Sequence, residues 1–384
     1  MAGVLRIGVN ALFLIPAGVG GTEIYLRSLL AALAEIDTEN EYFVFINAET
    51  AAGEPPLTPA AANFHAVRCR VRAANRPARL LWEQFCLPAQ AAARKLDVLF
   101  SPGFTSPLVT LGCPKVTVIH DLQHVRQPQN FGRLELAAWR ATVWASAHFS
   151  RQLVTVSENS RCDILEVYGV PADRVQVVRH GVEPAFSRLC EDPGLTRPIE
   201  HPYLLSVSTI HPHKNWGRWL EAYQKLSAEG LPHHLVIAGL EGNYSRELSV
   251  LMEATTLRER VHVTGWLARS ALLALFKFAD ALVFPSTFEG FGMPVLEAMA
   301  AGVPVACSDI APLREAAGPA AVYFDPYSVD SIVGAVRRLL TDGELRRHLR
   351  KLGRENTAHF TWPRAAERTL AILRQAAAGV VAER

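Results

Sequence analysis

The sequence lacks most features of a secreted, metal-binding or membrane-spanning protein. Its six cysteines are scattered without a C-x-x-C pair, and no histidines cluster at metal-ligand spacing. We therefore expect free thiols in a reducing compartment, the cytoplasm. No stretch approaches about 18 uninterrupted apolar residues, so no membrane-spanning helix is expected, while peripheral attachment to the cytoplasmic face of the membrane stays open. The N-terminal VLRIGVNALFLIP has no basic segment followed by a small-residue cleavage site, and it predicts a first strand.

Charge of one sign is also scarce, because the formal net charge is +2 over 384 residues. A nearly neutral chain is not expected to have nucleic acid as its main partner. The length predicts two domains, and the 49% of hydrophobic residues predicts large packed cores.

Two series of short apolar strands alternate with helical segments, which predicts an α/β protein with two parallel sheets. The strands are expected at 4–14, 42–47, 97–100, 116–120, 153–156 and 175–178, then at 203–207, 235–238, 261–264, 281–284, 303–307 and 322–324. Between the series, FSRLCEDPGLTRPIEHP has the prolines and mixed charge of a linker. We therefore expect Rossmann-like domains over 1–190 and 203–360, a linker over 191–202, and a helix over 361–384 that caps either half. Two such halves leave a central cleft for a ligand.

A glycine turn with Gly18, Gly20 and Gly21 follows the first strand and precedes a helix expected over 22–36. In GVGGTE, however, Glu23 stands where the last glycine of the dinucleotide-binding G-x-G-x-x-G would be. The turn therefore favours an anionic or hydroxyl-rich ligand at a helix N-terminus over a nicotinamide cofactor.

Residues 282–302, LVFPSTFEGFGMPVLEAMAAG, predict a buried strand, a glycine loop and a helix that ends near Gly302. Pro294 suits the first helical turn, with Glu289 before the turn and Glu297 within it. This places two carboxylates at the carboxyl end of a parallel sheet, where such sheets bind ligands. Because a carboxylate repels phosphate, we assign the glutamates to neutral hydroxyls and any phosphate to backbone N–H groups and a cation.

Two other strand ends carry polar residues. Lys214 follows the first strand of the second series, together with Ser208 and Thr209, and is placed to meet phosphate as a point charge. His120 and Asp121 end the strand at 116–120. A functional pair at the sheet edge and a helix cap beside a packed histidine fit this spacing equally well.

The segment 68–95 interleaves arginines with apolar residues such as Trp82 and Phe85. A basic amphipathic segment can lie on anionic lipid. A sheet-covering helix with a solvated arginine face is the favoured interpretation, because the charge is modest beside lipid-binding polybasic clusters.

The run from Glu289 to Glu297, EGFGMPVLE, resembles the E-x7-E signature of the retaining glycosyltransferases of family 4, which have the GT-B architecture. Further segments resemble this family in the same order along nearly the whole chain: Gly20-Gly21, His120-Asp121, Arg179-His180-Gly181-Val182 and Phe360-Thr361-Trp362. The resemblance is strongest to mannosyl- and related transferases of bacterial surface polysaccharides, including lipopolysaccharide.

The resemblance implies a role for each matching residue. His120 would lie at the reacting sugar, Glu289 would hold the donor sugar's hydroxyls, and Glu297 the ribose hydroxyls. Lys214 would neutralise the departing diphosphate, and Gly21 would approach the phosphate from the other domain. Backbone groups would contribute at Gly265, Trp266 and Leu267 around the nucleobase, at Gly290, Phe291, Gly292 and Met293 on the sugar hydroxyls, and at Val295 and Leu296 on the phosphates. Ser208 and Thr209 would add hydroxyl donors, and Gly20 and Pro294 would also belong to the donor site.

Two departures from the family pattern affect this site. Many members carry an arginine five residues before the lysine, and this chain has Thr209 there. His211 or His213 could supply that cation, in a loop that reads Pro212-His213-Lys214-Asn215. His180 replaces the asparagine of the family's N-G-V turn.

The implied reaction is glycosyl transfer from a nucleotide sugar, with GDP-mannose weakly favoured, to a saccharide or lipid-linked saccharide, with retained anomeric configuration. No D-x-D occurs in the chain, so neither a metal bridging the diphosphate nor another cofactor is expected. The alternatives are an epimerase or hydrolase on the same GT-B frame, a non-catalytic sugar-binding partner subunit and, last, a dehydrogenase.

Overall fold

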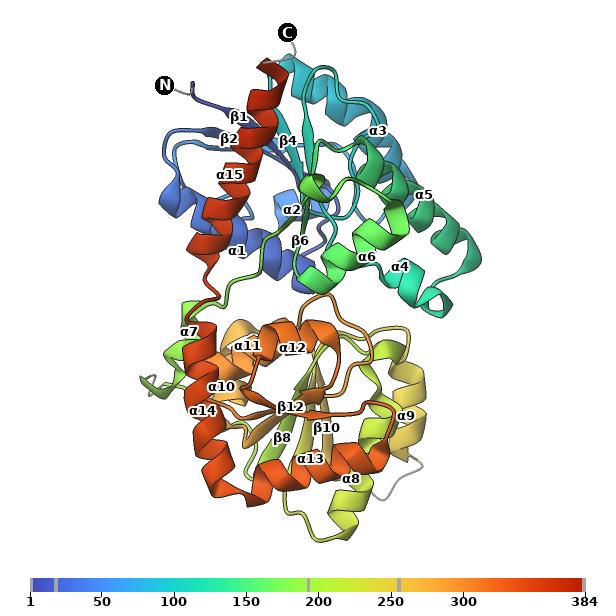
Figure 1. The fold of residues 1–384 in the computed structure, drawn as a ribbon, viewed down its shortest axis with the longest axis vertical. Helices are drawn as coiled ribbons and strands as arrows, with labels where there is room; N and C mark the ends of the chain where they lie inside the picture. Colours follow the sequence, from blue (N-terminus) through green and yellow to red (C-terminus); the bar gives the residue numbers. More distant parts are fainter. Residues whose placement is uncertain (1–2, 17–19, 192–193, 254–256, 382–384) are drawn as a thin grey trace. The chain divides into compact units, whose positions relative to one another are not determined.

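The computed structural model describes residues 3–16, 20–191, 194–253 and 257–381. The chain forms two compact units (Figure 1): unit 1 comprises Met1–Gly181 with Trp362–Arg384, and unit 2 comprises Val182–Thr361. Gly18, residues 192 and 193 of the predicted linker, and 382–384 of the predicted last helix lie outside the described residues. None of the described helices is both long and apolar enough to span a membrane.

Unit 1 is built on a seven-stranded parallel sheet in the order β3-β2-β1-β4-β5-β6-β7. Its strands are β1 (Arg6–Asn10), β2 (Glu41–Ile46), β3 (Phe64–Arg68), β4 (Val98–Ser101), β5 (Lys115–Val118), β6 (Gln152–Thr155) and β7 (Val175–Val177). Its helices are α1 (Gly21–Ile36), α2 (Ala48–Ala52), α3 (Arg76–Ala93), α4 (Gln123–Arg126), α5 (Arg133–Phe149), α6 (Glu158–Tyr168) and α15 (Trp362–Val381), with 3₁₀ turns η1 (Pro128–Asn130) and η2 (Ala172–Arg174).

Unit 2 has a six-stranded parallel sheet in the order β10-β9-β8-β11-β12-β13. Its strands are β8 (Tyr203–Val207), β9 (His234–Ala238), β10 (Val261–Gly265), β11 (Ala281–Phe284), β12 (Val305–Ser308) and β13 (Ala321–Phe324). Its helices are α7 (Pro184–Ser187), α8 (Trp216–Ala228), α9 (Ser245–Glu253), α10 (Arg269–Phe278), α11 (Met293–Ala300), α12 (Ala311–Ala317), α13 (Val329–Thr341) and α14 (Gly343–Thr357), with 3₁₀ turns η3 (Leu189–Glu191) and η4 (Pro212–Lys214).

Each sheet has one point where the direction of strand addition reverses. In unit 1 the chain adds β2 and β3 on one side of β1 and then places β4 on its other side, so the reversal lies between β1 and β4. In unit 2 it lies between β8 and β11 for the same reason. The carboxyl ends of the strands at such switch points are where open α/β sheets bind ligands.

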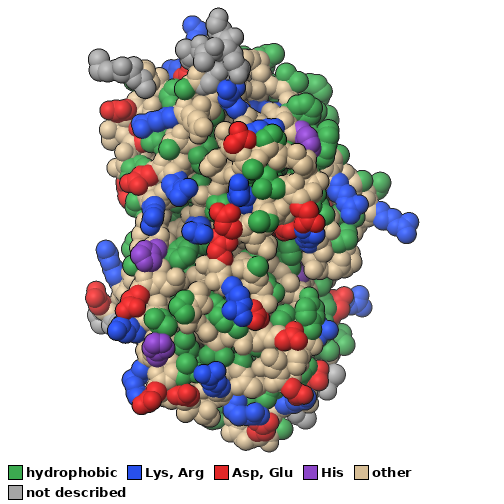
Figure 2. All heavy atoms as spheres, in the orientation of Figure 1, with side chains coloured by type: hydrophobic (Ala, Val, Ile, Leu, Met, Phe, Trp, Pro, Cys, Tyr) green, Lys and Arg blue, Asp and Glu red, His purple; other side chains and the backbone are tan. Residues whose placement is uncertain are grey.

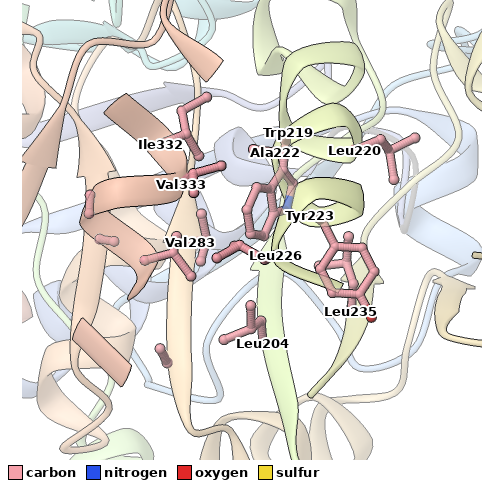
Figure 3. Close-up of a cluster of buried hydrophobic side chains, with 14 of the residues drawn as sticks. Leu204, Trp219, Leu220, Ala222, Tyr223, Leu226, Leu235, Val283, Ile332 and Val333 are labelled. Carbon is pink, nitrogen blue, oxygen red and sulfur yellow. The ribbon is translucent and has the colours of Figure 1, made fainter. Parts of the chain in front are cut away.

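The core of unit 2 fixes β8 and β11 beside each other. Side chains of β8, β9 and β11 pack against α8 and α13 in the cluster drawn in Figure 3. The Trp219 indole N–H donates to Ser206 Oγ at 3.1 Å, and that hydroxyl donates to the carbonyl of Val283 at 2.7 Å. The carboxyl ends of these two strands are therefore held by buried packing and by a buried hydrogen-bond chain.

The α/β fold with two parallel sheets is confirmed, and a strand is present at every predicted place. The first is much shorter than predicted, since β1 covers only Arg6–Asn10 of 4–14, and the others shift their bounds slightly. The prediction missed β3, an edge strand whose residues alternate between more and less buried positions next to the arginine-rich segment. The units divide at Gly181 rather than at 190. The last helix, α15, packs on α1, β4 and β5 of unit 1 (Figure 1).

The arginine-rich segment leads from β3 into α3, which buries Glu83, Leu87, Pro88 and Ala91. Arg72 and Arg76 lie on the exposed side and pair with Glu49 and Glu135. This agrees with the sheet-covering interpretation of the segment. Over the face of the molecule in Figure 2, Lys and Arg are interspersed with Asp and Glu, as the small net charge leads one to expect.

Candidate active site

Lys214 and Glu289 meet at the switch point of unit 2. Lys214 is the last residue of η4, which follows β8, and Glu289 lies in the loop that follows β11. Their side chains form an ion pair with 2.6 Å between Nζ and Oε1, and each side chain is 13% exposed. The structure thus brings together two of the three predicted catalytic residues, in a partly desolvated position where electrostatic interactions are stronger than in water.

A set of hydrogen bonds holds the Lys214 loop against the Glu289 loop. Thr287 donates to the carbonyl of His213 from its backbone N–H at 2.8 Å and from its hydroxyl at 3.1 Å. The Asn215 amide donates to the carbonyls of Pro285 and Pro326 at 3.1 and 2.7 Å. Asn215 has a φ of 62°, a left-handed conformation that asparagine tolerates better than most residues. Asn215 of the P-x-K-N loop therefore sets the position of its neighbour Lys214.

Two glycines that the sequence analysis missed support the same loop from β9. A Cβ on Gly239 would lie 2.1 Å from the carbonyl oxygen of Ser208, and one on Gly242 would lie 2.3 Å from that of Ile210. Both contacts are with backbone, which cannot move aside cheaply. Ser208 and Ile210 are further fixed by N–H bonds to the carbonyls of Ala238 and Leu240, each 3.0 Å long. In the sequence these glycines resemble those of any turn.

The E-x7-E segment leads into α11 through Gly292, which has a φ of 116°. This φ favours glycine, and a Cβ there would also lie 2.5 Å from Leu313 Cδ2, so that the Leu313 side chain would have to shift. The N–H groups of Val295 and Leu296, predicted to contact phosphates, donate to the carbonyl of Gly292 at 3.1 and 3.4 Å. A phosphate contact from either group would therefore be shared with that carbonyl, an arrangement common at helix ends. Pro294 carries no N–H and could contact a ligand only by packing.

Glu297 lies on α11 and is almost fully buried. Burial raises the pKa of its carboxyl to about 7, while Arg269 opposes the shift and Glu183 adds to it. Arg269 forms an ion pair with Glu183 and lies 4.5 Å over the Phe186 ring. Sequence reasoning missed Arg269 and Glu183, since neither belongs to the motif and 86 residues separate them.

The two histidines proposed to replace the family arginine differ in the structure. Burial lowers the pKa of His213 to about 2, with Lys214 and His211 adding to the shift. His213 is therefore neutral at physiological pH and cannot supply the missing cation. His211 stacks on His213 at 5.7 Å, and its Nδ1 lies 2.6 Å from Asn243 Oδ1.

The predicted nucleobase segment, Gly265-Trp266-Leu267, begins at the last residue of the edge strand β10. Gly265 has a φ of 67°, and its carbonyl accepts the N–H of Gly239 at 3.1 Å. The Trp266 indole is large, apolar and 48% exposed. The same glycine that supports Ser208 thus also anchors this segment.

His120 and Asp121 belong to unit 1. Asp121 Oδ1 accepts the N–H of Gln123, the first residue of α4, at 2.9 Å, but the N-cap position of this helix is Leu122 and carries no side-chain cap. His120 is buried, and burial lowers its pKa to about 4. Its Nε2 lies 2.9 Å from the carbonyl of Pro102, so the neutral ring carries its proton on Nε2 and keeps Nδ1 as an acceptor.

Gly20 and Gly21 begin α1, whose residue Tyr25 packs edge-on against His120 at 4.9 Å. Gly20 has a φ of 60°, which favours glycine. A Cβ on Gly21 would meet no heavy atom within 4 Å. The fold itself therefore leaves the space above Gly21 open.

A buried polar cluster at the switch point of unit 1 was not predicted. Glu83 Oε1 accepts hydrogen bonds from the Asn10 amide at 3.1 Å and the Thr105 hydroxyl at 3.3 Å. Burial raises the pKa of Glu83 to about 7, and Arg79 opposes the shift. Asn10 ends β1 and Thr105 follows β4. The cluster therefore lies at the switch point of the unit 1 sheet, just as Lys214 and Glu289 lie at the switch point of the unit 2 sheet. Among the described residues, no group of three or more His, Cys, Asp or Glu could hold a metal ion.

Two family models match the chain in succession. "Glycosyltransferase Family 4" covers residues 19–186, and "Glycosyl transferases group 1" covers residues 191–356, which includes Lys214, Glu289 and Glu297. The chain belongs to glycosyltransferase family 4. The two models divide it near the boundary between the two units, so each unit corresponds to one of them.

Two relatives of this glycosyltransferase come from Escherichia coli. It is 28% identical to O-antigen chain mannosyltransferase B over 263 residues, which are 66% of this chain and 68% of that protein. It is 29% identical to the serotype-specific mannosyltransferase WbdA over 235 residues, 57% of this chain but 28% of that longer protein. The sucrose-phosphate synthase of Thermosynechococcus elongatus has the same fold, with a TM-score of 0.79 over 98% of this chain and all of that one at 18% identity. The fold is GT-B.

Proposed function

We propose that this glycosyltransferase moves mannose from GDP-mannose to a saccharide or lipid-linked saccharide, with retained configuration, in cell-surface polysaccharide synthesis. The observation that carries the proposal is the Lys214–Glu289 ion pair at the switch point of unit 2, beside the N-terminus of α11. Both relatives described above are named as mannosyltransferases, which supports mannose as the transferred sugar.

The ion pair supports a division of labour between its two residues. Glu289 carries charge suited to accept hydrogen bonds from the sugar's hydroxyls, while Lys214 carries the charge that a departing diphosphate needs. The N-terminal end of the α11 dipole adds to the positive potential. Glu297, buried four residues into the same helix, is assigned to the ribose hydroxyls. Catalysis then rests on positioning and on stabilising the leaving group.

His120 and the Gly20–Gly21 turn complete the proposal from unit 1. The free acceptor position on His120 Nδ1 suits a hydroxyl of the reacting sugar. The open space at Gly21 suits close approach of a phosphate to its backbone. Because the chain has no D-x-D, we propose that transfer needs no divalent metal, and full activity in excess EDTA is the corresponding test.

A thermal-shift screen of nucleotide sugars tests the donor. GDP-mannose at a hundred times its Kd should stabilise the protein by about 2.7 kcal/mol, raising Tm by several degrees, while UDP-glucose and UDP-N-acetylglucosamine should shift it little. A larger shift with a uridine nucleotide would overturn the choice of donor. Incubation with a mannosylated acceptor and NMR of the product then tests retention, since the α-linked donor must give an α-linked product.

Replacing Glu297 by glutamine should remove the pH dependence of donor binding. With a pKa of about 7, the carboxyl loses its charge as the pH falls, and a protonated carboxyl is a weaker acceptor for ribose hydroxyls. GDP-mannose should therefore bind the wild type about tenfold more weakly at pH 6 than at pH 8. The Glu297→Gln variant should bind weakly at both. Calorimetric titration at the two pH values measures this, and an unchanged pH profile in the variant would contradict the role.

A further inference from the structure

A pocket of about 610 Å³ lies in unit 1 at the amino ends of β5, β6 and β7. We call it the amino-edge pocket. It is lined by residues 110, 112–115, 148–152 and 173–174, which come from the loop before β5, the end of α5 and the turn before β7. His120 and Asn10 lie at the carboxyl ends of their strands. The pocket therefore belongs to the opposite edge of the sheet from the candidate catalytic residues of this unit.

Among the charged residues that line the amino-edge pocket, Lys115, Arg151 and Arg174 are basic and Asp173 is acidic. Lys115 is 4% exposed, and its ammonium group donates to the carbonyls of Pro107 and Leu108. Arg174 donates to carbonyls of residues 147, 148 and 150 at the end of α5. No ion pair between described residues involves Lys115 or Arg174.

Carbonyl oxygens orient Lys115 and Arg174 but carry no full negative charge to balance these two cations. Burial lowers the pKa of Lys115 to about 8, the direction expected when a cation is held without a counter-charge. An anion in the pocket would relieve this cost. A phosphate group offers both the charge and the acceptor oxygens that lysine and arginine bind.

The loop that forms one wall of the pocket also exposes apolar side chains. Leu108, Val109 and Leu111 are 49%, 66% and 63% exposed, and Phe149, itself a lining residue, is 56% exposed. Trp144, one turn before His148 on α5, is also exposed, and its ring lies tilted against that of His148 with 4.3 Å between the ring centroids. Exposed apolar groups beside a basic pocket suit an anionic membrane surface. The basic groups bind the lipid phosphates at the headgroup level, and the apolar groups enter the acyl layer beneath.

We propose that the amino-edge pocket docks the protein on an anionic phospholipid membrane, with a lipid phosphate in the pocket and Leu108, Val109 and Leu111 in the acyl layer. No residue of the arginine-rich segment 68–95 lines the amino-edge pocket. Its exposed Arg72 and Arg76 are already paired with carboxylates. The docking does not depend on which sugar the enzyme transfers.

Co-sedimentation of the full chain with vesicles tests the proposal. The wild type should bind vesicles of phosphatidylcholine mixed with phosphatidylglycerol and not vesicles of phosphatidylcholine alone. The double variant Val109→Ser, Leu111→Ser should bind the mixed vesicles about tenfold more weakly, and Arg151→Gln should also weaken binding. The matched controls are Val250→Ser, an equally exposed valine on α9, and Arg350→Gln on α14. Both controls should bind like the wild type.

Undiminished binding of the double variant, or equal binding to both kinds of vesicle, would overturn the proposal. A Tm shift with inorganic phosphate, combined with no vesicle binding, would overturn it in favour of a free anion. The double variant should keep the Tm shift caused by the nucleotide sugar. Failure of membrane docking is thereby separated from failure of the proposed transferase activity.

Discussion

Lys214→Ala is expected to lower kcat for sugar transfer by about 10²- to 10³-fold, the usual cost of removing one preorganised group that stabilises transition-state charge. The expectation follows from the position of Lys214, a partly buried cation at the switch point of unit 2, held there by the Asn215 and Thr287 hydrogen bonds. With Thr209 in the slot of the family arginine and His213 neutral, neither of these two residues can replace the charge of the lysine. Initial rates with saturating donor and acceptor measure the effect.

Lys225→Ala provides the matched control for this experiment. Lys225 lies on α8 of the same unit and also forms an ion pair, with Asp330 at 3.0 Å, but at an exposed position. Pairs of that kind contribute about 0 to 1 kcal/mol, so Lys225→Ala should leave both kcat and Tm nearly unchanged. Glu289→Ala should likewise lower kcat by about 10²- to 10³-fold, with circular dichroism showing an intact fold in both variants. Full activity in either variant would contradict the assigned roles.

The parts of the site that could be predicted are those encoded locally. The strand at 281–284, the glycine loop and the helix start at Pro294 each have their own short-range signal, and the structure has β11 and α11 there. Charge reasoning assigns Lys214 to phosphate and the glutamates to hydroxyls, and the structure brings Lys214 within 2.6 Å of Glu289. Parallel βαβ units bring such strand ends to one edge of a sheet, which is why residues 75 positions apart could be associated.

The parts that could not be predicted depend on burial and on long-range contacts. Glu83 lies in the arginine-rich segment without a motif of its own, and its hydrogen bond to Asn10, 73 residues away, exists only in the folded chain. The neutrality of His213 likewise results from burial, which its sequence neighbours do not reveal. The last helix could have covered either unit, because an amphipathic pattern specifies that a face is buried and not which surface buries it.

Gly239→Ala is expected to destabilise unit 2 by about 3 kcal/mol or more, because it adds a Cβ where φ is suited only to glycine and where backbone cannot yield. The φ of Gly239 is 153°, and the new Cβ would lie 2.1 Å from the carbonyl oxygen of Ser208. The Ser208 loop would have to shift, and Lys214 follows six residues later on the same segment. Donor affinity should therefore fall together with stability, as urea unfolding and calorimetric titration would show.

Gly334→Ala makes the same chemical change but is expected to have the opposite effect on the stability of unit 2. Gly334 lies inside α13, is exposed, and a Cβ there would meet no heavy atom within 4 Å. Alanine in a helix interior is about 0.5–1 kcal/mol more favourable than glycine, so this variant should be slightly more stable and should bind donor as the wild type does. If Gly239→Ala behaved like Gly334→Ala, the close packing of Gly239 on the Ser208 loop would not be what positions Lys214. A loss of donor affinity confined to Gly239→Ala would instead show that the site depends on a residue outside the E-x7-E motif.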